Sequence, residues 1–216
     1  MSGHFPPAAH EALAASDPQL AALMERVDVE ALERRMSERT ADRFQALARI
    51  IVGQQVSTAA ARTVWGRIVE SFDGHPTPEA LVAEGAERKL RVAGMSGRKT
   101  SYMIGMAEAI VAGELRPDEL DELDDEEVIE TLVALRGLGR WSAEMFLIFD
   151  LGRPDVFSGG DLGLRHGVRI AHGLPELPTP EEAAAIAERW SPHRSLACLY
   201  LWEAAHMGEP IAEVKP

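Results

Sequence analysis

The chain has 216 residues, of which 46% are hydrophobic, and its formal net charge is −13 at pH 7. A chain of this length and composition can bury a core of its own, which excludes disorder as its main state. The single cysteine, Cys198, excludes an internal disulfide and a four-cysteine zinc or iron–sulfur centre. The sequence shows neither a signal-peptide pattern nor an apolar run of roughly 20 residues, so we expect a cytoplasmic protein without a membrane partner.

The negative charge is concentrated in one segment. Eight of the ten residues at 118–127 are acidic, and because they account for −8 of the total −13, the rest of the chain carries a net −5. We expect this run to form a solvated loop and helix start that faces away from any polyanion. Segments 136–142 and 162–170 are locally basic, so the net charge argues against nucleic-acid binding without excluding it.

Apolar residues recur at helical spacing along the chain, whereas the alternation typical of strands is almost absent. The spacing predicts a helix that ends near Gly53 and another that follows Ser57 and ends at residues 73–74. Further helix starts are predicted where a capping side chain precedes an acid or a proline, at Thr77, Asp124, Thr179 and Ser191. We therefore predict an all-α fold with about nine to eleven short helices.

No internal repeat or long flexible linker interrupts the helical pattern, so we expect one unit over residues 1–216 made of two lobes. We predict a central lobe at 45–155 and a second lobe made of 1–44 and 156–216. In this arrangement both termini belong to the second lobe.

Two glycines one residue apart, Gly137 and Gly139, stand between two helical patterns. They predict a tight turn whose backbone can approach another molecule closely. Since the turn opens a helix, its N–H groups at the positive end of the helix dipole suit a phosphate oxygen. An ordinary corner between two helices gives the same pattern, and the glycines alone do not separate these interpretations.

Four segments carry a family resemblance when they are taken in order: 51–57 (Ile-Val-Gly-Gln-Gln-Val-Ser), 135–143, 155–165, and 188–195 with Leu201-Trp202. Together they resemble the helix-hairpin-helix (HhH-GPD) superfamily of DNA glycosylases, most closely its AlkA-type alkylbase branch, the 3-methyladenine DNA glycosylase II family. The resemblance implies a two-lobed helical fold with an interlobe cleft and, at this chain length, no N-terminal β domain. It also implies a monomeric enzyme of base excision repair that acts on double-stranded DNA containing alkylated bases.

By this resemblance Asp161 matches the catalytic aspartate. A fixed carboxylate stabilises the positive charge that develops on the sugar as the N-glycosidic bond breaks, or orients the attacking water. The alternative is that Asp161 only caps the helix beginning at Leu162, although the two roles can coexist. Relatives often have a proline or an acid where this chain has Gly159 and Gly160, so we expect a more mobile loop there.

Trp141 stands where bifunctional relatives have the lysine that forms a Schiff base and cleaves the strand. The resemblance therefore implies a monofunctional enzyme without lyase activity that leaves an abasic site. Trp141 and Trp202 match aromatic positions of the base pocket, where electron-rich rings favour cationic alkylated purines. Core filling at helical spacing is the alternative for both rings, and we interpret Trp65 and Trp190 as structural.

Gln55 matches the wedge that fills the space left by a flipped nucleotide, a position held by leucine in some relatives. A buried glutamine at a helix end is the alternative interpretation of Gln55. The resemblance also implies phosphate contacts from the hairpin, with Arg165 and Lys99 as further candidates. The hairpin residues concerned are Gly137, Gly139, Arg140 and Ser142.

The same resemblance implies a structural Na⁺ or K⁺ at the hairpin, held by the main-chain carbonyls of Val133, Leu135 and Gly137. It implies no cofactor for catalysis and no iron–sulfur cluster. Two other functions stay open: a non-enzymatic helix-hairpin-helix module that binds DNA by shape, and a glycosylase for oxidised or deaminated bases. The sequence also leaves open the range of lesions, the oligomeric state and the DNA affinity.

Overall fold

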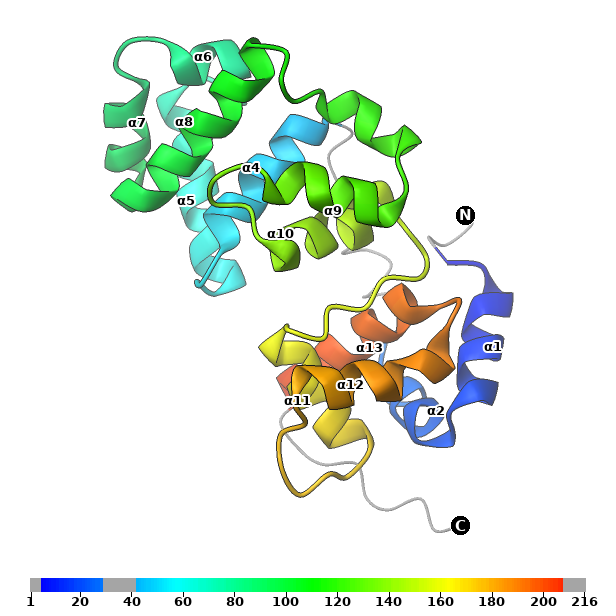
Figure 1. Ribbon diagram of the computed structural model, residues 1–216. Coiled ribbons are helices and arrows are strands. Elements are labelled where there is room, and N and C mark those ends of the chain that lie inside the picture. The colour runs from blue at the N-terminus through cyan, green and yellow to red at the C-terminus, as the bar shows by residue number, and fades with distance from the viewer. Residues whose placement is uncertain (1–4, 29–41, 208–216) are drawn as a thin grey trace. The chain divides into compact units, whose positions relative to one another are not determined.

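The computed structural model describes residues 5–28 and 42–207 (Figure 1). Within these ranges the chain forms helices and no strand, so the predicted all-α fold is confirmed. The described residues contain twelve α-helices and three short 3-10 or π segments, somewhat more than predicted from the spacing. None of the described helices combines the length and the apolar character that crossing a membrane requires.

The chain divides into two compact units, which we call unit 1 (Met1–Arg39 with Gly152–Pro216) and unit 2 (Thr40–Leu151). Unit 2 contains, in chain order, α4 (Arg43–Gly53), α5 (Thr58–Ser71), α6 (Pro78–Val82), α7 (Ala86–Ala93), α8 (Gly97–Val111), η1 (Pro117–Glu122), α9 (Asp125–Val133), α10 (Arg140–Phe146) and η2 (Leu147–Leu151). Unit 1 contains α1 (Pro7–Ser16), α2 (Pro18–Met24), α11 (Leu162–Ala171), α12 (Pro180–Ala187), η3 (Glu188–Trp190) and α13 (Arg194–Met207).

The core of unit 2 forms around α4, which contacts α5, α8 and α10 (Figure 1). Leu47 and Ile51, one turn apart on α4, are fully buried. Their burial fixes the C-terminal end of α4, and this end carries the segment Gly53–Gln55 next to the hairpin between α9 and α10. The position of that segment therefore follows from the amphipathic pattern of α4.

The core of unit 1 forms between α11 and α13, which pack closely together. Gly167 allows this approach, since a Cβ added there would lie 2.3 Å from the carbonyl oxygen of Leu201. Helices α1 and α2 also pack on this core through the buried side chains of Leu13 and Leu20. Asp161, at the start of α11, is held by this packed pair of helices.

Most of the predicted helix starts are confirmed, because their capping contacts are local. Thr77 accepts a hydrogen bond from the Ala80 N–H, and complete capping boxes form at Asp124 and Thr179. The predicted start at Ser191 is wrong, since α13 begins at Arg194. The Ser191 hydroxyl instead donates to Asp155 Oδ2 at 2.8 Å, and this partner lies far away in the sequence.

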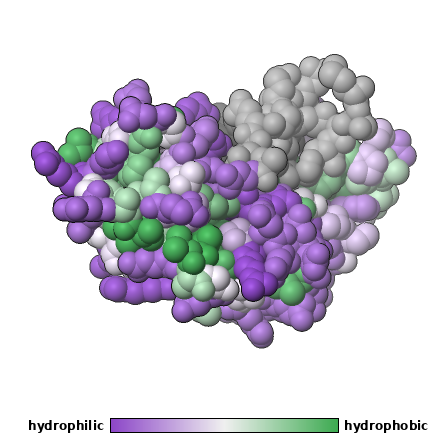
Figure 2. Space-filling model, turned by 90° about the horizontal axis from the view of Figure 1, so that it is seen from above, coloured by the Kyte–Doolittle hydropathy of each residue, from purple (hydrophilic) through white to green (hydrophobic). Residues whose placement is uncertain are grey.

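The acidic run at 118–127 lies largely on the surface, as predicted, and forms the start of α9. Its first half is a 3-10 helix, η1, rather than a loop, because the buried side chains of Pro117 and Leu120 attach it to unit 2. The face shown in Figure 2 is mostly hydrophilic, with several hydrophobic residues side by side left of its centre and smaller hydrophobic spots elsewhere. This mixture is typical of a polar protein surface.

Candidate functional site

Asp161 is the N-cap of α11, so the predicted helix cap is confirmed. Its Oδ1 accepts a hydrogen bond from the Leu164 N–H at 2.8 Å, and its own N–H donates to the Ser158 carbonyl at 2.9 Å. The same Oδ1 accepts a second bond from the indole N–H of Trp202 at 3.0 Å. Two candidate residues that are 41 positions apart thus meet in unit 1, and the carboxylate is held by donors on two helices.

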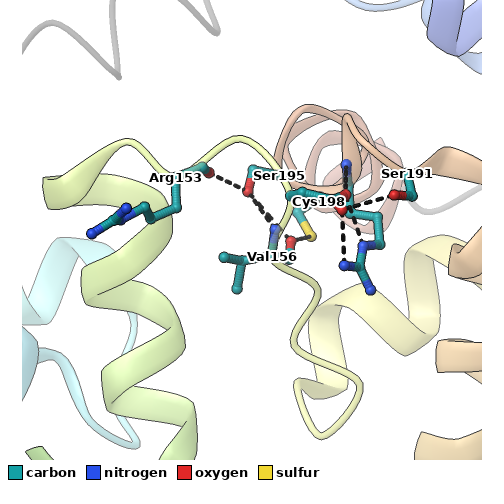
Figure 3. Close-up of polar contacts among 7 residues, drawn as sticks. Arg153, Val156, Ser191, Ser195 and Cys198 are labelled. Atoms are coloured by element: carbon teal, nitrogen blue, oxygen red, sulfur yellow. Dashed lines mark hydrogen bonds and ion pairs between the residues drawn. The ribbon is translucent and has the colours of Figure 1, made fainter. Parts of the chain in front are cut away.

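The segment that leads to Asp161 is attached to the start of α13 by the fully buried Ser195 (Figure 3). Its hydroxyl donates to the Arg153 carbonyl at 2.6 Å and accepts the Val156 N–H at 3.0 Å. The Ser195 N–H donates in turn to the Pro154 carbonyl at 3.1 Å. Three consecutive contacts therefore fix the backbone at 153–156, where the chain enters unit 1.

An ion pair strengthens this attachment. The Arg194 guanidinium donates to both carboxylate oxygens of Asp155, at 2.8 and 2.9 Å, and Ser191 adds a third bond (Figure 3). Burial raises the pKa of Asp155, but the hydrogen bonds from Arg194 and Ser191 outweigh it and hold this pKa below its ordinary value. A bidentate Arg–carboxylate pair of this kind also fixes the orientation of both partners.

The second half of the segment is packed as well, and the mobility expected at Gly159 and Gly160 stays a prediction. Ser158 is fully buried, and a Cβ added to Gly159 would lie 2.8 Å from the Pro180 carbonyl oxygen. Gly159 therefore allows a close approach to the start of α12.

In unit 2 the hairpin turn is shaped by Gly137, which has φ +97°. A Cβ added at Gly137 would lie 2.1 Å from Cγ of the Tyr102 ring, so both the backbone conformation and the space exclude a side chain. Leu138 anchors the turn in the core, where it is buried. Tyr102, on α8, was not identified from the sequence, and nothing in its local pattern marks it as the support of the hairpin.

Gln54 connects the end of α4 to the hairpin and was also missed from the sequence. Its side-chain amide donates to the Gly137 carbonyl at 2.8 Å and to Ser142 Oγ at 3.1 Å. A polar residue directly after the apolar face of α4 was the only available signal. Ser142 itself is buried.

Gln55 follows α4 in the left-handed region, with φ +56°, and its side chain is exposed. The alternative interpretation, a buried glutamine at a helix end, is therefore wrong. A residue other than glycine in this conformation costs about 1–2 kcal/mol, and such strain is concentrated at functional sites. The exposed Val56 follows it directly, so an apolar side chain stands beside the candidate wedge.

Two hollows adjoin the hairpin in unit 2, and Gln54 and Gln55 line both of them. The larger, of about 640 Å³, lies against the turn Gly137–Gly139 and includes the basic side chains of Arg98 and Lys99. The smaller, of about 350 Å³, is lined by Trp141 and Ser142 in addition to the two glutamines. The candidate residues of unit 2 thus gather around the end of α4 and the hairpin.

The basic candidates already have partners within the protein. The exposed Arg140 forms ion pairs with Glu126 at 2.6 Å and with Glu144 at 3.1 Å, and hydrogen bonding to Glu126 raises the pKa of Arg140. Lys99 Nζ donates to the Val52 carbonyl at the end of α4, where a positive charge complements the helix dipole, and burial lowers the pKa of Lys99. Arg165 donates to the Pro178 carbonyl.

The carbonyls predicted to hold a monovalent cation lie at the end of α9 and in the hairpin turn. The Leu135 carbonyl accepts the Leu138 N–H at 3.2 Å, and the Gly137 carbonyl accepts the Gln54 amide. Each carbonyl oxygen has a second lone pair, and neutral oxygens suit a hard cation, so this donor set fits Na⁺ or K⁺. Among the described residues, no cluster of three or more His, Cys, Asp or Glu side chains could hold a metal ion.

Comparison with known proteins places this geometry in a family. The family model described as HhH-GPD superfamily base excision DNA repair protein matches residues 48–193, a range that includes both the hairpin and Asp161. The chain therefore belongs to the HhH-GPD superfamily of base excision DNA repair proteins.

Individual relatives agree with this assignment. DNA-3-methyladenine glycosylase 1 of Schizosaccharomyces pombe is 34% identical over 176 residues, which cover 80% of this chain and 77% of that protein. The crystal structure of a DNA-3-methyladenine glycosidase from Bacillus halodurans has a TM-score of 0.77 at 33% identity, covering 96% of this chain and 94% of the other. The S. pombe 3-methyladenine DNA glycosylase in complex with abasic DNA has a TM-score of 0.72 at 28% identity, covering 91% and 100%.

Proposed function

We propose that this protein is a monofunctional DNA glycosylase that hydrolyses the N-glycosidic bond of alkylated purines in duplex DNA and leaves an abasic site. The family assignment and the names of the relatives, which are 3-methyladenine glycosylases, support the class of reaction. The observation that carries the proposal is the carboxylate of Asp161, which is held in place by the Leu164 N–H and the Trp202 indole.

In the proposed reaction, the bond between C1′ of the deoxyribose and the purine nitrogen breaks, and its electron pair goes to the base. A methylated purine is cationic before this step, so it leaves as a neutral base without a general acid. Asp161 stabilises the positive charge that develops on the sugar, because a preorganised opposite charge acts most strongly at the transition state. Water then adds its oxygen to C1′ and releases one proton to the carboxylate or the solvent.

The monofunctional character rests on Trp141 at the second residue of α10. A Schiff base requires an amine, which an indole does not provide, so strand cleavage by that route is not expected. Trp141 lines the hollow of about 350 Å³ together with Gln54 and Gln55, a volume within the range of small-molecule sites. We assign Trp141 to the base pocket, where its ring favours a cationic base.

Recognition of the DNA duplex is assigned to the end of α4 and to the hairpin. The exposed Gln55 is the proposed wedge, and it stands in the left-handed backbone conformation just after α4. The proposed phosphate contacts are backbone N–H groups of the turn Gly137–Gly139 and of Ser142, supported by Arg98 and Lys99 in the adjoining hollow. Arg140 must exchange Glu126 or Glu144 for a phosphate before it can contribute.

A bound Na⁺ or K⁺ at the hairpin is part of the proposal, held by the carbonyls of Val133, Leu135 and Gly137. This ion would be structural and would place a fixed positive charge near the phosphate, and the proposed catalysis itself uses no cofactor. Monomeric state and cytoplasmic location stay predictions. The range of lesions beyond methylated purines is left open.

The decisive experiment measures base release and strand cleavage on a methylated DNA duplex under single-turnover conditions. Asp161→Asn should lower the rate of base release at least about 100-fold and leave duplex binding intact. Asp118→Asn, the same change at an exposed acid of η1, is the matched control and should keep the full rate.

Three outcomes would contradict the proposal. If the wild type binds DNA without releasing a base, the protein is a shape-reading module and Asp161 is only a helix cap. If only oxidised or deaminated bases are released, the substrate class is wrong. Cleavage of the strand at the abasic site would exclude the monofunctional mechanism.

A further inference from the structure

Trp202 is predicted from the family resemblance to be a wall of the base pocket, but its indole N–H is engaged elsewhere. It donates to Asp161 Oδ1 at 3.0 Å, the same oxygen that accepts the Leu164 N–H at 2.8 Å. Leu164 is on α11 and Trp202 on α13, so the two donors reach the oxygen from different helices. Together they resist rotation of the carboxylate about its terminal torsion, which is otherwise soft.

The sequence of α11 leaves space for this bond. A Cβ added at Gly163 would lie 3.1 Å from Asp161 Oδ1 and 3.1 Å from Trp202 Cδ1. Those distances are shorter than ordinary van der Waals contact, so a side chain at residue 163 would displace the indole or the carboxylate by a few tenths of an ångström. Glycine is a poor helix former, and its presence in the first turn of α11 is explained by this contact.

One helical turn further along, Gly167 serves the same approach. A Cβ at Gly167 would lie 2.3 Å from the Leu201 carbonyl oxygen, directly before Trp202 in the sequence. Residues four apart share one face of a helix, so the two glycines form a continuous strip without side chains. This strip brings the backbone of α13 close to α11 and presents Trp202 to Asp161.

We propose that Trp202 is a positioning residue that acts through Asp161, and that Gly163 is required for this role. The inference rests on the proposed function, because it assumes that Asp161 is the catalytic carboxylate. A hydrogen bond to a charged group is strong enough to set an orientation, and an off-axis carboxylate stabilises the developing charge less well. The indole N–H, rather than the ring face, is therefore the group of Trp202 that matters for the rate.

The test compares Trp202→Phe, which keeps an aromatic ring and removes the N–H, with the wild type in single-turnover base release. We expect the rate to fall roughly 10- to 100-fold, as loss of a hydrogen bond to a charged group predicts, while affinity for the methylated duplex stays within about twofold. The same substitution in the Asp161→Asn background should cause no further loss, because the group through which it acts is gone.

A second variant keeps both functional side chains and disturbs only their contact. Gly163→Ala should lower the rate to a similar extent as Trp202→Phe without changing duplex affinity. Gly160→Ala is the matched control, since a Cβ there would meet no heavy atom of the described residues within 4 Å. Circular dichroism and thermal unfolding show whether each variant is folded. If Gly163→Ala does not fold, the test rests on Trp202→Phe alone.

The outcomes separate this inference from the proposed function. If the wild type releases no base, the proposed function fails. If the wild type is active and Trp202→Phe keeps the full rate of base release, the positioning role is wrong. It is also wrong if Trp202→Phe lowers the rate by the same factor in the wild-type and Asp161→Asn backgrounds, because the ring then acts on the base. Full activity of a folded Gly163→Ala variant would also overturn it, even where the Asp161→Asn background is too slow to measure.

Discussion

The surroundings of Asp161 in unit 1 and the hairpin of unit 2 are built by different means. At Asp161 the contacts are hydrogen bonds, which Trp202 and Leu164 donate to the carboxylate. Ser195 holds the segment that leads to Asp161 by a hydrogen bond to the Arg153 carbonyl. In the hairpin, the turn depends on a left-handed glycine whose missing side chain makes room for the ring of Tyr102. The first region therefore depends mainly on hydrogen-bonding groups and the second mainly on shape, although Gly163 also clears space beside Asp161 and Gln54 also donates to the hairpin.

This difference matches the two tasks that we propose. Stabilising a charge that exists only in the transition state requires one group at a fixed position and orientation. Contacting a phosphate through backbone N–H groups requires a surface that another backbone can approach. Substitutions should accordingly affect the two regions in separable ways: those around Asp161 should lower mainly the rate, and those in the hairpin should lower mainly stability and DNA affinity.

The largest effect is expected for Gly137→Ala. The left-handed backbone adds about 1–2 kcal/mol of strain, and the overlap with Tyr102 adds a further 1–3 kcal/mol, as overpacking does. We expect the free energy of unfolding to fall by about 2–5 kcal/mol and DNA affinity to fall at least about tenfold, because the turn moves. Chemical denaturation and a DNA-binding titration measure the two quantities.

Gly139→Ala provides the control within the same motif. Gly139 has φ −101°, and an added Cβ would meet no heavy atom within 4 Å among the residues that the structure describes. Its free energy of unfolding should change by less than about 1 kcal/mol, the cost of an unfavourable N-cap residue. Equal destabilisation by the two substitutions would show that the hairpin does not depend on the Tyr102 contact.

The sequence predicted the interactions between residues that are close together in the chain. The caps at Asp124, Asp161 and Thr179 are correct because donor and acceptor lie three residues apart. Ser191 has the same local pattern, yet its partner is Asp155, 36 positions away. A competing long-range hydrogen bond therefore displaced the predicted helix start to Arg194.

The contacts that were missed all join distant parts of the chain. Gln54 binds the hairpin 83 positions further on, and the ring of Tyr102 supports Gly137 from another helix. Gly163 looks like an ordinary helical glycine until Trp202 is placed against it. Motif spacing thus located the candidate residues, while the groups that orient them became apparent only from the packing of the helices.

A second prediction concerns the ionised Asp17 of unit 1 and its contribution to the stability of the fold. Burial raises the pKa of Asp17, but hydrogen bonds from His172, Trp190 and the Leu20 N–H outweigh it and lower this pKa to about 2. Because the folded-state pKa lies below the value of 3.8 expected for an unfolded chain, the ionised Asp17 stabilises the fold above pH 4. This contribution is lost as the pH falls from about 4 towards 2.

Asp17→Asn should therefore reduce the free energy of unfolding by about 2 kcal/mol at pH 7. The difference from the wild type should shrink as the pH is lowered from 4 to 3, which denaturant titrations at each pH would measure. Asp118→Asn, at an exposed acid, should show no such trend. The loss caused by Gly137→Ala should be independent of pH, since it is steric, and a pH-dependent loss there would remove the contrast between the two regions.

The smallest effect is expected for Glu126→Gln, which removes the ion-pair partner of Arg140 at the hairpin of unit 2. Arg140 and Glu126 form an ion pair with both side chains more than half exposed, at 59% and 65%, and such pairs contribute less than about 0.5 kcal/mol to stability. Glu126→Gln should leave the unfolding free energy within that range. It should raise DNA affinity about twofold to threefold at low salt, because Arg140 becomes available for one phosphate.

The control is Glu119→Gln, which removes the same charge from another exposed pair, Arg116–Glu119. A general effect of the acidic surface would raise affinity equally in both variants, since long-range repulsion does not depend on which acid is removed. A larger gain for Glu126→Gln, which disappears as salt is added, would assign the phosphate contact to Arg140 itself. Equal gains would mean that Arg140 makes no phosphate contact of its own, and phosphate binding in unit 2 would then depend on the backbone of the hairpin together with Arg98 and Lys99.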